Sequence, residues 1–148
     1  MIREDETRPP DPSIDEEVEV ADMLSGLVVV SVGRGGPVQA ALNRALKAAG
    51  AIVLVKTSPA EVTRMLDTFV PSVVLTEVVP GDDDGPQILA ETRRLTAERG
   101  GGLPVVGVSW ETSDPAPILR GGFHGALVGT FDALDVARAV LRAVRQRS

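Results

Sequence analysis

Acidic side chains in the middle of this sequence are of the residue type that could take part in metal chemistry. Glu77 ends the apolar run 72–77, and three consecutive aspartates follow at 82–84. A carboxylate at the end of a buried strand must be paired or hydrated, so Glu77 is a candidate functional group. Calcium-binding loops alternate their acids with other residues and end on a distant glutamate. The three consecutive aspartates therefore favour a solvated turn over a metal site.

Two other residue types exclude most catalytic chemistry. The chain of 148 residues has no Cys and a single His, His124. The lack of Cys excludes a disulfide scaffold, a thiolate metal site and a Cys nucleophile, and one His cannot form a multi-His metal site. No Ser or Cys arrangement around His124 indicates a nucleophilic triad, so a role at a loop or strand entry is favoured. We expect a protein that is not an enzyme, without catalytic residues, metal or cofactor.

A glycine-rich loop, Gly33-Arg34-Gly35-Gly36, lies between a predicted strand and a predicted helix, which is the setting of a phosphate-binding turn. Val38 stands where a dinucleotide-binding fingerprint needs glycine, and the Gly-Lys-Ser/Thr of a P-loop is absent. A flexible loop without a ligand is the favoured interpretation. A flavodoxin-like small-molecule or nucleotide sensor that binds through this loop is the alternative function.

Alternating strand and helix patterns must position these groups. Five apolar, β-branched runs are typical of buried strands, and apolar stripes at helical spacing follow them. The runs cover residues 27–32, 51–55, 72–77, 103–109 and 126–128. Right-handed crossovers between such units give a parallel sheet with helices on both faces. We predict an α/β fold, a flavodoxin-like three-layer sandwich with a five-stranded parallel sheet in the order 2-1-3-4-5. Ligands of such sheets bind at the carboxyl ends of the strands.

Charge divides the chain into two parts. The formal net charge is −6, but residues 1–26 contain nine acids and two bases, whereas residues 27–148 contain twelve acids and thirteen bases. We expect an acidic N-terminal extension over 1–26 and one domain over 27–148. Prolines and few apolar residues over 1–12 indicate disorder, and a capping-box spacing predicts a short helix over 13–24. An unstructured, solubilising tail is the alternative.

The composition also limits location and partners. The N-terminus lacks the basic and apolar regions of a signal peptide, and no apolar run approaches the roughly 20 residues that span a bilayer. The nearly neutral charge of residues 27–148 gives no reason to expect salt-dependent binding of nucleic acid. We expect a cytoplasmic protein with neither a membrane nor a nucleic-acid partner. Because the sequence ends soon after the last predicted helix, we also expect no DNA-binding module to follow.

Four segments occur in an order and spacing that is fairly specific: Pro71–Gly85, Gly107–Trp110, Leu119–Phe123 and Ala126–Phe131. The first resembles the third strand and following loop of response-regulator receiver domains, the CheY-like family. The second resembles that family's fourth strand with its switch Ser/Thr, and the last two resemble its fifth-strand region. The likeness extends over about residues 27–146. It implies a two-component or phosphorelay signalling domain whose partner is another signalling protein.

The resemblance places the family's phosphorylation machinery on residues of other types. Receivers are phosphorylated on an aspartate that ends strand three, where this chain has Glu77. Gly33 and Arg34 replace the acidic pair after strand one, and Gly129 replaces the lysine that ends strand five. Only the switch hydroxyl, Ser109, is retained. Since an aspartyl phosphate needs a metal and a cation, we expect an atypical, degenerate receiver that acts by protein–protein interaction without conventional phosphorylation.

Arg34 lies in the loop after the first predicted strand, next to the end of the third, where Glu77 lies. We hypothesise that the two side chains form an ion pair that fixes the site in one charged state. The alternative is that both are exposed at the rim of the site and do not touch.

Two features predict an interaction surface. Arg138, Arg142 and Arg145 form a basic stripe on the last predicted helix, and Trp110, the only Trp, follows Ser109 near the loop rim. A solvated face and ordinary packing are the respective alternatives. The last helix and strand five are the surface through which we expect a homodimer. The acidic extension emerges at the same edge, so its acids would dock on the arginines and make this surface salt-sensitive.

Overall fold

Helices and strands alternate along the part of the chain that the computed structural model describes, residues 20–99 and 102–146. In chain order they are β1 (Val28–Val32), α3 (Pro37–Ala48), β2 (Ile52–Lys56), α4 (Pro59–Leu66), β3 (Val73–Glu77), α5 (Asp84–Arg99), β4 (Val105–Ser109), α6 (Ala116–Arg120), β5 (Gly125–Val128) and α7 (Ala133–Arg145). Each predicted strand overlaps an observed one. Among these residues no helix is long and apolar enough to cross a membrane.

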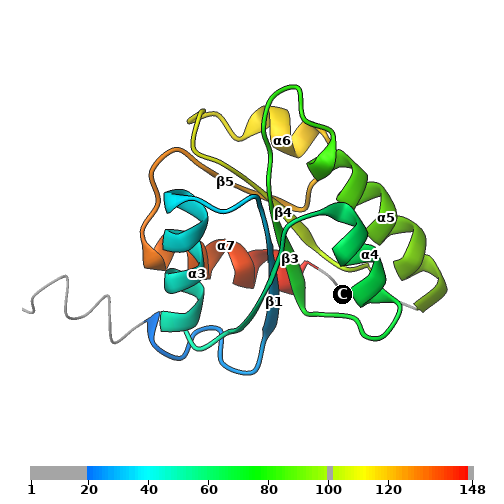
Figure 1. The fold of residues 1–148 in the computed structure, drawn as a ribbon. Coiled ribbons are helices and arrows are strands. Elements are labelled where there is room, and N and C mark those ends of the chain that lie inside the picture. Colours follow the sequence, from blue (N-terminus) through cyan, green and yellow to red (C-terminus); the bar gives the residue numbers. More distant parts are fainter. Residues whose placement is uncertain (1–19, 100–101, 147–148) are drawn as a thin grey trace, which may run out of the picture.

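The five strands form one parallel sheet in the order β2-β1-β3-β4-β5, which confirms the predicted fold. Figure 1 shows α3 and α7 on one face of this sheet and α4 and α5 on the other. Val32 is in register with Thr76, and Glu77 is in register with Val108. The carboxyl ends of β1, β3 and β4 therefore meet at one edge of the sheet, where this class of fold places its sites.

Local signals in the sequence set where the helices begin. At the start of α7, Asp132 accepts the N–H of Asp135 and the Asp135 side chain accepts the N–H of Asp132, a capping box. Helix α5 begins at Asp84, two residues before Pro86. Its start is fixed by the Asp82 carboxylate, which accepts the N–H of Asp84 at 3.0 Å.

Apolar cores lie on both faces of the sheet, because successive side chains of a strand point to opposite faces. The core on one face joins α3 and α7 to Val29 and Leu75. The core on the other face joins α4, α5 and α6 to Val30 and Val74. Strands buried on both faces explain why the sequence shows continuous apolar runs rather than alternating ones.

The described end of the acidic extension packs against the domain. Val20 and Leu24 are buried in the core of the α3/α7 face, and the N–H of Leu24 donates to the carbonyl of Ala49 at 2.8 Å. Residues 21–26 form turns, and most of the helix predicted over 13–24 lies outside the described residues. The chain thus contributes to the core before residue 27, where we placed the start of the domain.

Candidate functional site

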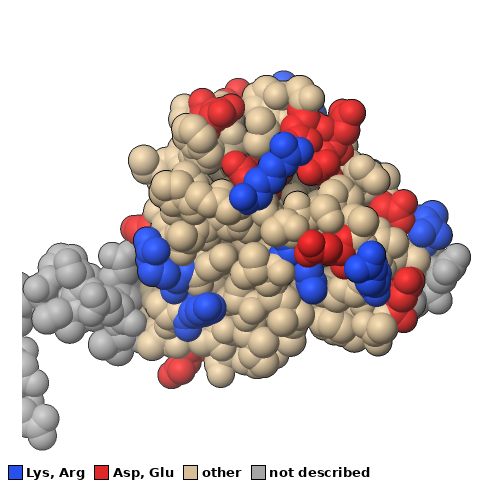
Figure 2. Space-filling view, in the orientation of Figure 1, with Lys and Arg blue, Asp and Glu red and all other residues tan. Residues whose placement is uncertain are grey.

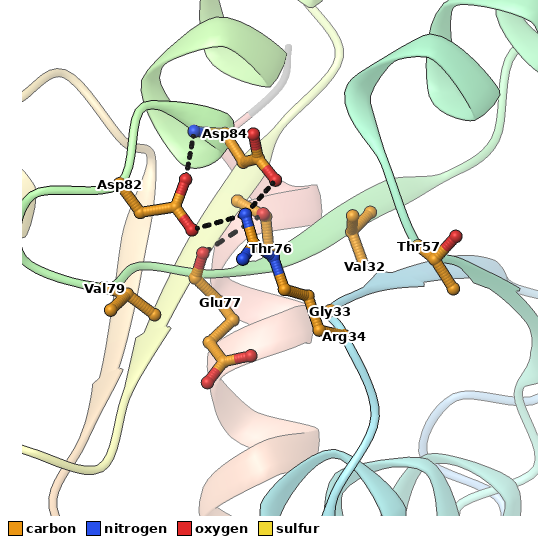
Figure 3. A pocket seen from close by; sticks show the side chains of 9 residues that line it. All are labelled: Val32, Gly33, Arg34, Thr57, Thr76, Glu77, Val79, Asp82 and Asp84. Carbon is orange, nitrogen blue, oxygen red and sulfur yellow. Dashed lines mark hydrogen bonds and ion pairs between the residues drawn. The ribbon is translucent and has the colours of Figure 1, made fainter.

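A small cleft opens at the carboxyl ends of β1 and β3, with a volume of about 30 Å³ (Figure 3). It is lined by Val32, Gly33, Arg34, Thr57, Thr76, Glu77, Val79, Asp82 and Asp84. A single water needs roughly 10–15 Å³. The cleft therefore has room for water or a small ion and is too small for a nucleotide.

Arg34 supplies the positive charge of this cleft. One guanidinium nitrogen, Nη2, lies 3.0 Å from Oδ2 of Asp82 and 3.3 Å from Oδ2 of Asp84, as Figure 3 shows. The prediction of a merely solvated turn is thus wrong for these two aspartates. Because the Arg34 side chain is 73% exposed, we expect these pairs to add little stability. Their effect is to hold a guanidinium between two carboxylates.

Glu77 does not form the expected ion pair with Arg34. Its carboxylate extends away from the guanidinium in Figure 3, and no described residue forms an ion pair or hydrogen bond with it. Strand alternation explains the separation. Glu77 follows Leu75 by two positions and shares its α3/α7 face, whereas Asp84 begins α5 on the opposite face. Arg34 reaches toward that opposite face.

Ser109 and Gly129 lie together at the ends of β4 and β5, beside the cleft but not lining it. The N–H of Gly129 donates to the carbonyl of Ser109 at 3.0 Å, and Ser109 is buried. Gly129 has a φ of +68°, a conformation that costs little for glycine and is strained for other residues. Position 129 therefore differs from the family's lysine in two ways. It has no side chain, and its backbone conformation would be strained for a lysine.

The glycine-rich loop folds back on α3. The N–H of Gly35 donates to Oε1 of Gln39 at 2.7 Å, and a Cβ at Gly33 would lie 2.9 Å from the Gln39 side chain. Sequence reasoning missed Gln39, although Gln at the third position of a helix is a known partner of N-terminal amides. Since Gln39 already occupies one amide of the loop, the sensor alternative gains no support from the geometry.

The residues expected to form an interaction surface lie outside the cleft. Arg138, Arg142 and Arg145 are exposed on α7. Trp110 is 53% exposed, so ordinary core packing does not describe it. Over the described ranges, no group of three or more acidic, His or Cys side chains is placed to hold a metal ion.

His124 joins two neighbouring strands. It lies just before β5, its N–H donates to the carbonyl of Val105 at 2.8 Å, and its Nδ1 accepts the N–H of Val105 at 3.0 Å. Burial and the positive charge of Arg93 lower the pKa of His124. The side chain is therefore a neutral acceptor at the entry to a strand, the role that the sequence favoured.

We expect the free energy of unfolding to decrease as the pH is lowered below about 6.5, the ordinary pKa of histidine. The folded-state pKa of His124 is lowered, so the unfolded chain binds the proton first and unfolding is favoured as pH falls. His124→Asn keeps an acceptor for the N–H of Val105 and removes this titration. Urea unfolding between about pH 7 and pH 5 should show a shallower loss of stability for the variant. Identical pH profiles would contradict the assignment.

Comparison with known proteins gives a result at the level of structure only. No family model matches the sequence, and no curated protein matches it. Among solved structures, the chemotaxis response regulator CheY4 of Vibrio cholerae is similar, with a TM-score of 0.64 and 16% identity over 81% of this chain and 98% of that chain. The signal receiver domain of NarL from Mycobacterium tuberculosis has a TM-score of 0.64 and 22% identity over 83% and 99% of the chains. The chain has the fold of a response-regulator receiver domain.

A third similar structure is a receiver domain with an ion in its own cleft. The receiver domain of the sensor histidine kinase PA1611 from Pseudomonas aeruginosa has a TM-score of 0.67 and 17% identity, over 82% of this chain and 99% of that one. That structure has a magnesium ion coordinated in its active-site cleft. The receiver fold confirms the resemblance found in the sequence.

Proposed function

We propose that this chain is an atypical receiver-like signalling domain that acts through protein–protein contact without conventional aspartyl phosphorylation. One observation carries the proposal: the Arg34 guanidinium is held between Asp82 and Asp84 in the cleft at the ends of β1 and β3. A receiver such as that of PA1611 coordinates magnesium in its cleft. In this chain the cleft instead contains a permanent side-chain cation, Arg34, which is paired with Asp82 and Asp84.

Other groups in the cleft and beside it support the same proposal. Phosphoryl transfer develops negative charge that needs a metal ion and a cation near the acceptor. The carboxylate of Glu77 points away from the one cation of the cleft lining, Arg34. Gly129 provides no side chain, and its positive φ disfavours a lysine. An acyl phosphate on Glu77 would form without the usual stabilisation.

A surface around α6, β5 and α7 is suited to partner contact. β5 is an edge strand, and Trp110 and Leu119 are about half exposed nearby. A groove between β5 and α7 includes Arg138 and Arg142 in its lining. We propose that a cytoplasmic signalling protein binds this surface and that a second copy of the chain can occupy it, forming a homodimer through α7 and β5. Nucleic acid and membranes are not proposed as partners.

Removing the cation should create a response to magnesium. Mg²⁺ prefers one or two carboxylates with water ligands, and Arg34→Asp leaves Asp82 and Asp84 without their counter-ion. We expect Mg²⁺ to raise the Tm of Arg34→Asp by about 2–4 °C for each kcal/mol of binding free energy. The wild-type Tm should stay unchanged. Thermal unfolding with millimolar MgCl₂ and with EDTA measures both.

A matched control separates the cleft from general charge effects. Arg94→Asp also reverses an exposed arginine that pairs with an acid, Glu91, at 2.9 Å, but on α5 outside the cleft. This control should show no dependence on Mg²⁺. If Mg²⁺ stabilises the wild type as much as Arg34→Asp, the guanidinium does not exclude the metal and the proposal fails.

A further inference from the structure

Charge is distributed unevenly between the two helical layers. α3 and α7 together carry five basic residues and one acid, whereas α4 and α5 carry four of each. The basic residues of the α3/α7 layer are Arg44, Lys47, Arg138, Arg142 and Arg145. Figure 2 shows basic side chains over α3 on the visible face. The α3/α7 layer is therefore a surface suited to an acidic segment.

A groove of about 410 Å³ runs along α7 within this layer. Its lining combines apolar and basic side chains: Met23, Arg138, Leu141, Arg142, Arg145 and Gln146. The three arginines form no ion pair with another described residue, and each is exposed. An occupant of this groove would thus need apolar groups flanked by acids.

The acidic extension leaves the packed part of the chain at this groove. Val20 is buried in the core of the same layer, and Met23 lines the groove itself. Residues 1–19 contain eight acids and two bases. The nearest part, residues 13–19, contains four of these acids together with Ile14 and Val18. Ile14 and Val18 are four positions apart and would share one face of a helix.

The length of this segment matches the groove. The groove-lining residues of α7 and the adjoining Gln146 span positions 138–146, which is about 12 Å at 1.5 Å per residue. Seven residues cover about 10 Å as a helix and about 23 Å when extended. A segment of this length is therefore long enough, in either conformation, to extend along most of the stretch that carries the three arginines.

We propose that residues 13–19 of the same chain bind in the α7 groove, with Ile14 and Val18 on Leu141 and Met23 and with the acids beside the arginines. Exposed ion pairs are individually weak and are screened by salt. Attachment to the groove at Met23 gives the segment a high effective concentration, so weak pairs suffice. The docking does not depend on the proposed function. Its consequence does, since Arg138 and Arg142 also line the β5–α7 surface proposed for partners.

The absence of Cys from the chain makes a direct test simple. Ser13→Cys introduces a single thiol for a nitroxide spin label on the full-length protein, and ¹⁵N NMR detects the amides that the label broadens. We expect loss of signal for amides at 138–146 in low salt. These signals should recover at about 1 M NaCl, where exposed charges more than about 3 Å apart are largely screened. Broadening that is absent from α7, or is equal on α4 and α5, would overturn the proposal.

Charge variants test which groups hold the segment. The triple variant Arg138→Gln, Arg142→Gln and Arg145→Gln should lose the broadening of α7. The control removes the same charge outside the groove, by Lys56→Gln, Arg64→Gln and Arg120→Gln, and should keep the broadening. Equal behaviour of the two triple variants would contradict binding at the arginines.

A mixture of two samples shows whether the segment comes from the same chain or from a second copy. One sample is spin-labelled and at natural isotope abundance, and the other is ¹⁵N-labelled and carries no spin label. Docking within one chain predicts no broadening in this mixture. Broadening of α7 in the mixture would show that the segment of a second copy fills the groove, which overturns the intramolecular form of the proposal.

Discussion

Replacing Leu24 by alanine is expected to lower the free energy of unfolding by about 2–5 kcal/mol, although Leu24 precedes the first strand. Its side chain is fully buried against α3 and α7, and its N–H donates to the carbonyl of Ala49 at 2.8 Å. Truncation would leave a cavity in the core of that face. Urea unfolding followed by circular dichroism measures the change.

Leu119→Ala is the matched control, because it removes the same atoms from a side chain that is 48% exposed on α6. Its effect should stay within about 0.5 kcal/mol. A change below about 1 kcal/mol for Leu24→Ala, or equal effects of the two variants, would show that the end of the acidic extension is not part of the folded core.

Gly107→Ala is expected to destabilise the protein by about 1–3 kcal/mol. A Cβ at this position of β4 would lie 2.6 Å from Cγ2 of Ile118 and 3.0 Å from Cγ2 of Val78. Ile118 is buried, so α6 would have to move away from the sheet. We expect the variant to show a lower urea midpoint and faster hydrogen exchange in α6, next to the surface proposed for partners.

Gly102→Ala controls for the loss of a glycine from the unfolded chain. A Cβ at Gly102 would meet nothing within 4 Å, so this variant should be neutral or more stable by about 0.4–1 kcal/mol. If Gly107→Ala behaves like Gly102→Ala, then β4 does not hold α6 by close packing at this glycine.

The fold could be predicted because its strands are buried on both faces. The run that became β3 shows the pattern plainly, with Val73, Val74, Leu75 and Thr76 all buried. Such continuous runs, separated by helical stripes, permit few topologies other than a parallel sheet. The ends of elements were less certain, and α5 begins at Asp84 because of a side-chain contact from Asp82.

The contacts of the candidate site could not be predicted to the same depth. The sequence placed Arg34 and Glu77 at the same edge of the sheet, but it did not show that the two side chains extend toward opposite faces. Arg34 pairs instead with Asp82 and Asp84, two acids of a turn that appeared solvated. A long arginine can reach several acids at one edge, and spacing alone does not select among them.

Intact-mass measurement after incubation with acetyl phosphate and Mg²⁺ is the most direct test of signalling without conventional phosphorylation. We expect the mass of the wild-type protein to stay unchanged, because the cleft holds a guanidinium and Glu77 lacks a stabilising cation. An increase by the mass of one phosphoryl group in the wild type, abolished in Glu77→Gln, would contradict it.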